Sequence, residues 1–213
     1  RVVTVELDVT SSESVRDAIS VCESTLGGLD VLVNSAGVIN ITPLEEISEQ
    51  QWDLVVDVDL KGVFLCSQAA APLLRLSSSG RIVNLGSDAS KLGIPLIASY
   101  VAAKHGVIGL TKSMAAELAP HKVTVNCVCP VGTPETGMGQ DVLDMKVKAT
   151  GARRSDIMAT TASNVPIGRN GTTADVVNAV MFLLSEESEF ITGSTIDVDG
   201  GLINTTVMRG SSE

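Results

Sequence analysis

The stretch Arg81-Ile-Val-Asn-Leu-Gly-Ser87 decides the fold of this chain, together with the helical pattern that follows it. Its first five residues form a short apolar run that follows Ser77-Ser78-Ser79-Gly80, as is typical of a buried strand. An apolar helical segment then runs over residues 99–118 and ends before Pro120, and a second apolar run follows at Val123–Val128. A strand, a helix and a strand in this order predict a βαβ unit with two parallel strands in one sheet.

The same alternation continues outward from this unit in both directions. The sequence predicts further strands at Val2–Leu7, at Leu29–Asn34 and near Ser194–Val198. It predicts further helices from a capping box at Thr10 to about residue 26, from a capping box at Ser48 to about residue 75, and over residues 173–185. We therefore predict an α/β protein with one domain over residues 1–213. It should be a doubly wound, Rossmann-like parallel sheet with helices on both faces and a polar tail.

The composition excludes several classes of partner. The chain has 25 Asp and Glu against 15 Lys and Arg, a net charge of −10, which argues against nucleic acid or an anionic membrane surface as the main partner. No apolar run approaches the roughly 18 residues of a membrane span. Four cysteines are too few for a disulfide scaffold, so we expect a reducing, cytoplasmic location. Cys127 and Cys129 share one face of a strand, which favours small core residues over a metal pair.

One pair of residues in the long helix suggests acid/base chemistry. Tyr100 and Lys104 are four residues apart, so their side chains lie on one helix face. An ammonium beside a phenol favours the phenolate and is expected to lower the tyrosine pKa. Ser87 follows the strand of residues 81–85, at the sheet edge where open α/β folds bind ligands. This arrangement suits proton transfer to a ketone or from an alcohol.

These motifs resemble those of the short-chain dehydrogenase/reductase family. The resemblance rests on Tyr100-x-x-x-Lys104 with Ser87 thirteen residues before the tyrosine, on Asn34-Ser-Ala-Gly37 and on Asp197-Val-Asp-Gly-Gly201. The motifs occur in the family's order and extend over nearly the whole chain. The resemblance implies an NAD(P)-dependent oxidoreductase that interconverts a secondary alcohol and a ketone by hydride transfer.

The resemblance also implies a role for particular residues. Tyr100 would be the general acid/base, Ser87 would hydrogen-bond the substrate oxygen, and Lys104 would hold the nicotinamide ribose. Tyr100 and Lys104 thus belong to both the catalytic and the cofactor-binding sets. The other expected cofactor-binding residues are Asp8, Val9, Asn34, Ala36, Gly37, Pro130, Val131, Thr133 and Thr136.

The chain departs from the family pattern at two positions of the expected site. Asp59 stands where the family usually has an asparagine that helps to hold a proton-relay water, and we include it among the catalytic residues. It is either a tolerated variant or the mark of a slower or differently pH-tuned enzyme. Pro130-Val131 replaces the usual Pro-Gly, so Thr133 or Thr136 is expected to contact the nicotinamide.

A third departure concerns the phosphate-binding loop. The family begins with a strand and a glycine-rich loop that binds the pyrophosphate at a helix N-terminus. This sequence begins at what would be the third strand, so it lacks the first two strands of the fold. We expect residues 1–213 alone to have an open apolar sheet edge, to aggregate and to bind NAD(H) weakly. The alternative to an active enzyme is a catalytically silent scaffold or subunit of this fold that has lost nucleotide binding.

The remaining expectations concern substrate and assembly. Residues 132–165 have no clean period and are predicted to form a substrate lid, with a soft apolar side that includes Met138. The sequence leaves the substrate open, and NAD and NADP as alternatives. The long helices are apolar over more than one face, and the family resemblance implies a homotetramer, with a dimer as the fallback.

Overall fold

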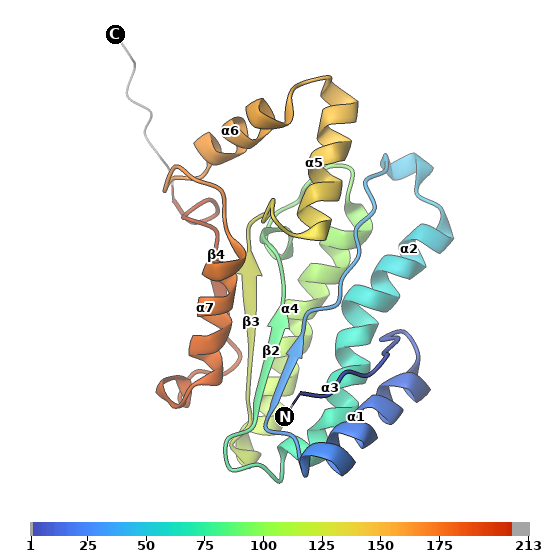
Figure 1. Cartoon of the computed structure of the whole chain (residues 1–213), viewed down its shortest axis with the longest axis vertical. Coiled ribbons are helices and arrows are strands. Elements are labelled where there is room, and N and C mark those ends of the chain that lie inside the picture. Colours follow the sequence, from blue (N-terminus) through green and yellow to red (C-terminus); the bar gives the residue numbers. More distant parts are fainter. Residues whose placement is uncertain (1, 206–213) are drawn as a thin grey trace.

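The computed structural model describes residues 2–205, in which four parallel strands form one sheet (Figure 1). The strands are β1 (Val31–Asn34), β2 (Arg81–Leu85), β3 (Thr124–Pro130) and β4 (Thr195–Val198), and they lie side by side in that order. In β1 and β2, Asn34 lies opposite Asn84. The predicted α/β fold with a parallel sheet is confirmed, and the order of the strands in the sheet follows their order in the chain.

Helices cover both faces of this sheet. The helices are α1 (Ser12–Leu26), α2 (Glu49–Val56), α3 (Gly62–Leu74), α4 (Ala98–Leu118), α5 (Gly137–Thr150), α6 (Arg154–Asn164) and α7 (Thr173–Leu184). Short 3₁₀ turns lie at η1 (Leu44–Glu46), η3 (Asp88–Ser90), η4 (Ala119–His121) and η5 (Glu186–Ser188). In Figure 1 α5 and α6 lie beyond the end of the sheet toward which the strands point.

The core is built from alternate residues of the central strands. Ile82 of β2 packs with Leu74 of α3 and Leu118 of α4 on one face of the sheet. Val83, the next residue of β2, packs with Leu183 of α7 on the other face. Successive strand residues point to opposite faces, so a fully apolar strand is stable only when both faces are covered. These side chains are small aliphatics, in keeping with the low aromatic content.

The predicted helix over residues 48–75 forms, with one irregular turn. Ser48 and Gln51 make the expected capping box at the start of α2. Residues Asp57–Lys61 form a π-helical turn, η2, in which the Gly62 N–H donates to the Asp57 carbonyl five residues back. α3 then continues to Leu74. Such single π turns often occur at functional sites.

Two predictions at the level of elements are wrong. Residues 2–7 are exposed and do not form a strand, because no other strand in the described part of the chain lies beside them to pair their backbone groups. The N-cap of α1 is Ser11 rather than Thr10, which instead hydrogen-bonds to Asp8. Residues 132–165, which showed no clean period, contain two helices, α5 and α6, and their role as a substrate lid stays a prediction. The polar tail at 206–213 and Arg1 lie outside the described residues.

Candidate active site

Ser87 lies just beyond the carboxyl end of β2 and is held by the η3 turn. Its hydroxyl accepts a hydrogen bond from the Ala89 N–H at 3.2 Å and donates one to Asp88 Oδ1 at 2.8 Å. Its own N–H donates to Ser90 Oγ at 3.0 Å. The side chain is 8% exposed. This capping arrangement fixes the hydroxyl at the sheet edge where the sequence placed it.

Tyr100 and Lys104 project from the first two turns of α4 toward the same sheet edge. Both are buried, and the Lys104 Nζ lies 5.4 Å from the centroid of the Tyr100 ring. Lys104 Nζ also donates to the carbonyl of Leu85, the last residue of β2, at 3.0 Å. The Ser87 hydroxyl lies close enough to the Tyr100 phenol to influence its ionisation. The structure therefore brings Ser87, Tyr100 and Lys104 together.

The electrostatics of Tyr100 differ from the sequence expectation. Burial raises the pKa of the Tyr100 phenol, and the carboxylates of Asp59 and Asp88 raise it further, while the neighbouring Ser87 hydroxyl lowers it. We expected Lys104 to lower this pKa. That expectation is wrong in this structure because the ring is desolvated and because the lysine charge is paired with a carboxylate.

The paired carboxylate is Asp59, the residue that departs from the family pattern. Its Oδ2 lies 3.1 Å from Lys104 Nζ, and the two side chains are 0% and 5% exposed. Its Oδ1 accepts a hydrogen bond from the Val38 N–H at 2.8 Å. Burial raises the pKa of Asp59, and the charge of Lys104 opposes that rise. The π-helical turn thus carries a buried acid into the site.

Known proteins share both the sequence and this architecture. A family model described as enoyl-(acyl carrier protein) reductase matches residues 1–203. The 2-(S)-hydroxypropyl-CoM dehydrogenase 3 of Xanthobacter autotrophicus is 39% identical over 195 residues, which are 92% of this chain and 74% of that protein. The 3-oxoacyl-(acyl-carrier-protein) reductase of Staphylococcus aureus is 41% identical over 198 residues, 93% of this chain and 76% of that protein. The chain is a short-chain dehydrogenase/reductase.

A solved structure agrees with this membership. The ligand-free aldohexose dehydrogenase of Thermoplasma acidophilum superposes with a TM-score of 0.91 at 33% identity, over 98% of this chain and 81% of that one. Members of this family are oxidoreductases, so this chain is an enzyme by descent. None of the helices within residues 2–205 has the length and apolar character that crossing a membrane requires.

The amides of this short-chain dehydrogenase/reductase join β1, β2 and two helices beneath the site. Asn34 Nδ2 donates to Asn84 Oδ1 at 2.8 Å and to Ser67 Oγ at 3.1 Å. Asn84 Nδ2 donates to Thr111 Oγ1 of α4 at 2.9 Å. Asn34 was expected to line the cofactor channel. Its side chain is buried in this network and supports the sheet edge, and its contact with a cofactor stays a prediction.

The other expected cofactor residues of the first half lie on loops near the π turn. Gly37 is close to the ion pair, since a Cβ built on it would lie 3.1 Å from Asp59 Oδ2. Val9 packs against α3, because a Cβ at Gly62 would meet its Cγ2 at 2.9 Å. Asp8 and Ala36 are exposed. Hydrogen bonds from Thr10 lower the pKa of Asp8, so it carries a negative charge at neutral pH.

The segment after β3 holds the expected cofactor residues of the second half. Pro130 ends β3 and Val131 is buried. Thr133 Oγ1 donates to the Val131 carbonyl at 3.2 Å. Thr136 is the N-cap of α5, and its hydroxyl donates to the Thr133 carbonyl at 2.9 Å. Both threonines are thus fixed by local hydrogen bonds, and which of them would meet a nicotinamide stays a prediction.

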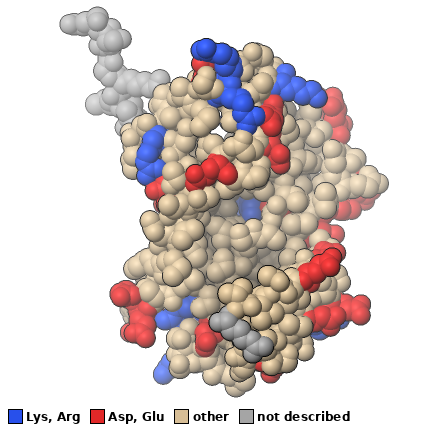
Figure 2. All heavy atoms as spheres, in the orientation of Figure 1, with Lys and Arg blue, Asp and Glu red and all other residues tan. Residues whose placement is uncertain are grey.

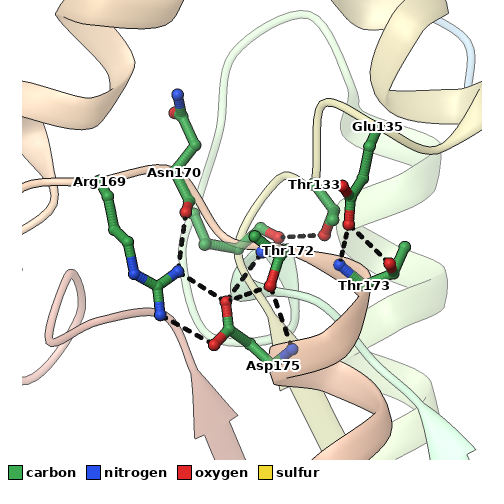
Figure 3. Close-up of polar contacts among 8 residues, drawn as sticks. Thr133, Glu135, Arg169, Asn170, Thr172, Thr173 and Asp175 are labelled. Carbon is green, nitrogen blue, oxygen red and sulfur yellow. Dashed lines mark hydrogen bonds and ion pairs between the residues drawn. The ribbon is translucent and has the colours of Figure 1, made fainter.

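A network at the start of α7 ties this segment to the body of the enzyme (Figure 3). Glu135 points at the first turn of α7 and accepts hydrogen bonds from the Thr173 N–H and, at 2.6 Å, from its hydroxyl. Arg169 donates two hydrogen bonds to Asp175, at 2.7 and 2.8 Å. Thr172 and Asp175 form a capping box. Negative charge near a helix N-terminus is favourable, so the network anchors the segment at α7.

This network predicts a pH dependence of stability. The bonds from Arg169 and Thr172 hold the pKa of Asp175 well below its usual value of 3.8. A carboxyl whose pKa is lower in the folded state contributes stability above its unfolded pKa, and that contribution is lost as the pH falls further. Urea unfolding between about pH 6 and pH 2 should show a shallower loss of stability in Asp175→Asn than in the parent. Parallel curves would contradict this.

Two site residues were missed by the sequence reasoning. Asp88 directly follows Ser87 and holds its hydroxyl, so its position alone could have suggested it. The carbonyl of Leu85 accepts from Lys104, and a backbone group leaves no signal in the sequence. Cys127 and Cys129 are buried, with their sulfurs 3.8 Å apart, which is consistent with the small core residues expected.

Proposed function

We propose that the protein is an NAD(P)-dependent oxidoreductase that interconverts a secondary alcohol and a ketone, with Tyr100 as general acid/base. The observation that carries this is the placement of the Ser87 and Tyr100 hydroxyls close together at the carboxyl edge of the sheet, with Lys104 beside the ring. The names of the relatives support the same chemistry, since 3-oxoacyl groups and hydroxypropyl groups carry a ketone and an alcohol.

The two hydroxyls suit a carbonyl substrate. Its oxygen would accept hydrogen bonds from Ser87 and Tyr100, and these donors would stabilise the negative charge that develops on it. Tyr100 would donate its proton to that oxygen in reduction and take it back in oxidation. The nicotinamide supplies and accepts the hydride. In this structure the Ser87 hydroxyl donates its single proton to Asp88, so it would turn that proton from Asp88 to the substrate oxygen when a carbonyl binds.

The residues present fit the nicotinamide end of the cofactor. An ammonium has three donors, and the contacts of Lys104 with Leu85 and Asp59 leave it able to reach a ribose hydroxyl. Gly37, Thr133 and Thr136 lie on loops at the same sheet edge. The described residues 2–205 contain no glycine-rich loop between a strand and a helix N-terminus, which is the arrangement that binds a pyrophosphate.

The substrate end of the site is proposed to lie under residues 132–165. Met138, in the first turn of α5, packs on the cluster that contains Tyr100 and Ile97. Figure 2 shows Lys and Arg side chains gathered at the end of the molecule formed by α5 and α6, with a hollow below them. Arg153 pairs with Asp156, and Arg154 pairs with Asp144. These two arginines are therefore better interpreted as solvent-exposed ion pairs than as groups that bind an anionic substrate. We also propose a cytoplasmic homotetramer, with a dimer as the alternative.

A screen of secondary alcohols and ketones tests the function. NADH and NADPH should be supplied at millimolar concentration, because weak pyrophosphate binding is expected, and both should be titrated by calorimetry. We expect turnover that follows the absorbance of the reduced cofactor with at least one of the two. Neither binding nor turnover would instead support the silent scaffold that has lost nucleotide binding, and binding without turnover of any substrate would contradict the proposed activity.

A further inference from the structure

The buried pair of Asp59 and Lys104 sets the charge around the single tyrosine. Asp59 is fully buried, and its partners among the described residues are the Lys104 ammonium and the Val38 N–H. A lysine beside a phenol stabilises the phenolate only as far as its charge is not cancelled. Here the cancelling charge lies 3.1 Å from the ammonium, inside the protein, where solvent does not screen it.

Polar and charged groups from several elements around Tyr100 contribute to this balance. Ser87 and Asp88 face it from the end of β2, Cys129 from β3, Asp59 from the π turn and Lys104 from its own helix. Two of these are carboxylates, which disfavour a negative phenolate oxygen, and one is an ammonium, which favours it. Cys127, beside Cys129, lies near the same ammonium. The combined effect of these charges therefore opposes loss of the phenol proton.

We propose that Asp59 is a positioning residue that fixes and neutralises the Lys104 ammonium, and that it thereby biases the site toward a protonated Tyr100, the form that donates a proton in ketone reduction. This rests on the proposed role of Tyr100 as the general acid/base. It makes the aspartate a determinant of the pH dependence of each direction, since alcohol oxidation needs a tyrosine that accepts a proton at the working pH.

The π turn explains why the carboxylate stays at this place. Asp59 is the middle residue of the turn, and its second oxygen is held by the Val38 N–H at 2.8 Å. Gly37 allows the close approach, because a Cβ there would lie 3.1 Å from Asp59 Oδ2. The carboxylate is therefore fixed from two sides, and the lysine is fixed by Asp59 and by the Leu85 carbonyl.

The test uses the fact that Tyr100 is the single tyrosine of the sequence. Alkaline titration of the ultraviolet absorbance of the phenolate reports this residue alone, with circular dichroism recorded on the same samples to follow unfolding. Asp59→Asn removes the charge and keeps the shape. We expect it to lower the ionisation midpoint by about one pH unit or more, the usual effect of one nearby charge. Asp59→Ser, which keeps an oxygen for the Val38 N–H, should do the same and serves if the first variant does not fold.

Asp57→Asn is the matched control. Asp57 lies on the same π turn, makes the same kind of contact with Lys61 at 3.2 Å, and has a side chain that is 41% exposed. This variant changes the net charge equally and should leave the midpoint unchanged. Equal midpoints in the parent and both Asp59 variants, or an upward shift in them, would overturn the proposal.

Enzyme assays separate this proposal from the proposed function. The limb of the pH profile that rises with pH in alcohol oxidation should move to lower pH in Asp59→Asn. A shifted spectroscopic midpoint in a protein that turns over no substrate would leave the charge coupling in place and contradict the function. Turnover with unshifted midpoints would uphold the function and overturn the role of Asp59.

Discussion

Replacing Tyr100 with Phe should lower the turnover number by about 10²- to 10⁴-fold, the usual contribution of a positioned acid/base. Phe keeps the ring that packs with Ile97 and Ala103 and removes only the hydroxyl that meets Ser87. Folding should therefore be retained. The measurement is steady-state turnover of a substrate found in the screen, with thermal unfolding recorded beside it.

The control for this variant is Ser99→Ala. Ser99 precedes Tyr100 on α4 and is buried, but its hydroxyl donates to Asn40 at 2.7 Å rather than to the site. Loss of this hydroxyl should leave turnover within a few-fold of the parent. If Tyr100→Phe also kept the parental turnover, the catalytic assignment of Tyr100 would be refuted.

Replacing Asn84 with Ala should lower the free energy of unfolding by about 3 kcal/mol or more, since each buried polar group left unpaired costs about 1–3 kcal/mol. Asn84 is fully buried in β2, accepts from Asn34 and donates to Thr111. The variant leaves both of these partners without their bond and opens a small cavity between the strand and α4.

Urea unfolding measures this loss. Asn178→Ala, an exposed site on α7, is the matched control and should change the unfolding free energy by less than about 0.5 kcal/mol. Losses of equal size at the two positions would show that the amide network does not hold β1, β2 and α4 together as described.

The sheet and its helices were predictable where local signals and packing agree. The strand at 81–85 and the helix that begins near residue 99 have clear apolar patterns and end at serine, glycine or proline, and both form as expected. Val2–Leu7 has an equally clear strand pattern and does not form one. A strand needs a neighbour to pair its backbone, and no pattern within the segment itself can supply that.

The site was predictable as a set of residues but not as an electrostatic arrangement. The spacing of Ser87, Tyr100 and Lys104 identified residues that the structure brings together. The rise of the Tyr100 pKa depends on burial and on Asp59, forty-one residues earlier in the chain, so helix spacing alone indicated the wrong direction. The Asn34–Asn84 bond likewise joins distant segments, and asparagines in strands carry no mark of their partners.

The π turn at residues 57–61 has a rotational consequence for the helix that contains it. Val55 before the turn and Val63 after it are both buried, although eight residues of regular α-helix would set them about 80° apart around the axis. A π turn holds more residues than an α turn and so reduces this angle, and the two valines lie in core clusters that share Leu60, while Asp59 stays on the side of Lys104. For the orientation of the helix, the number of residues in this segment therefore matters more than their identities. A substitution on the exposed side of the helix leaves the rotation of α2 relative to α3 unchanged. The loss of one residue would instead rotate α2 relative to α3 about the helix axis.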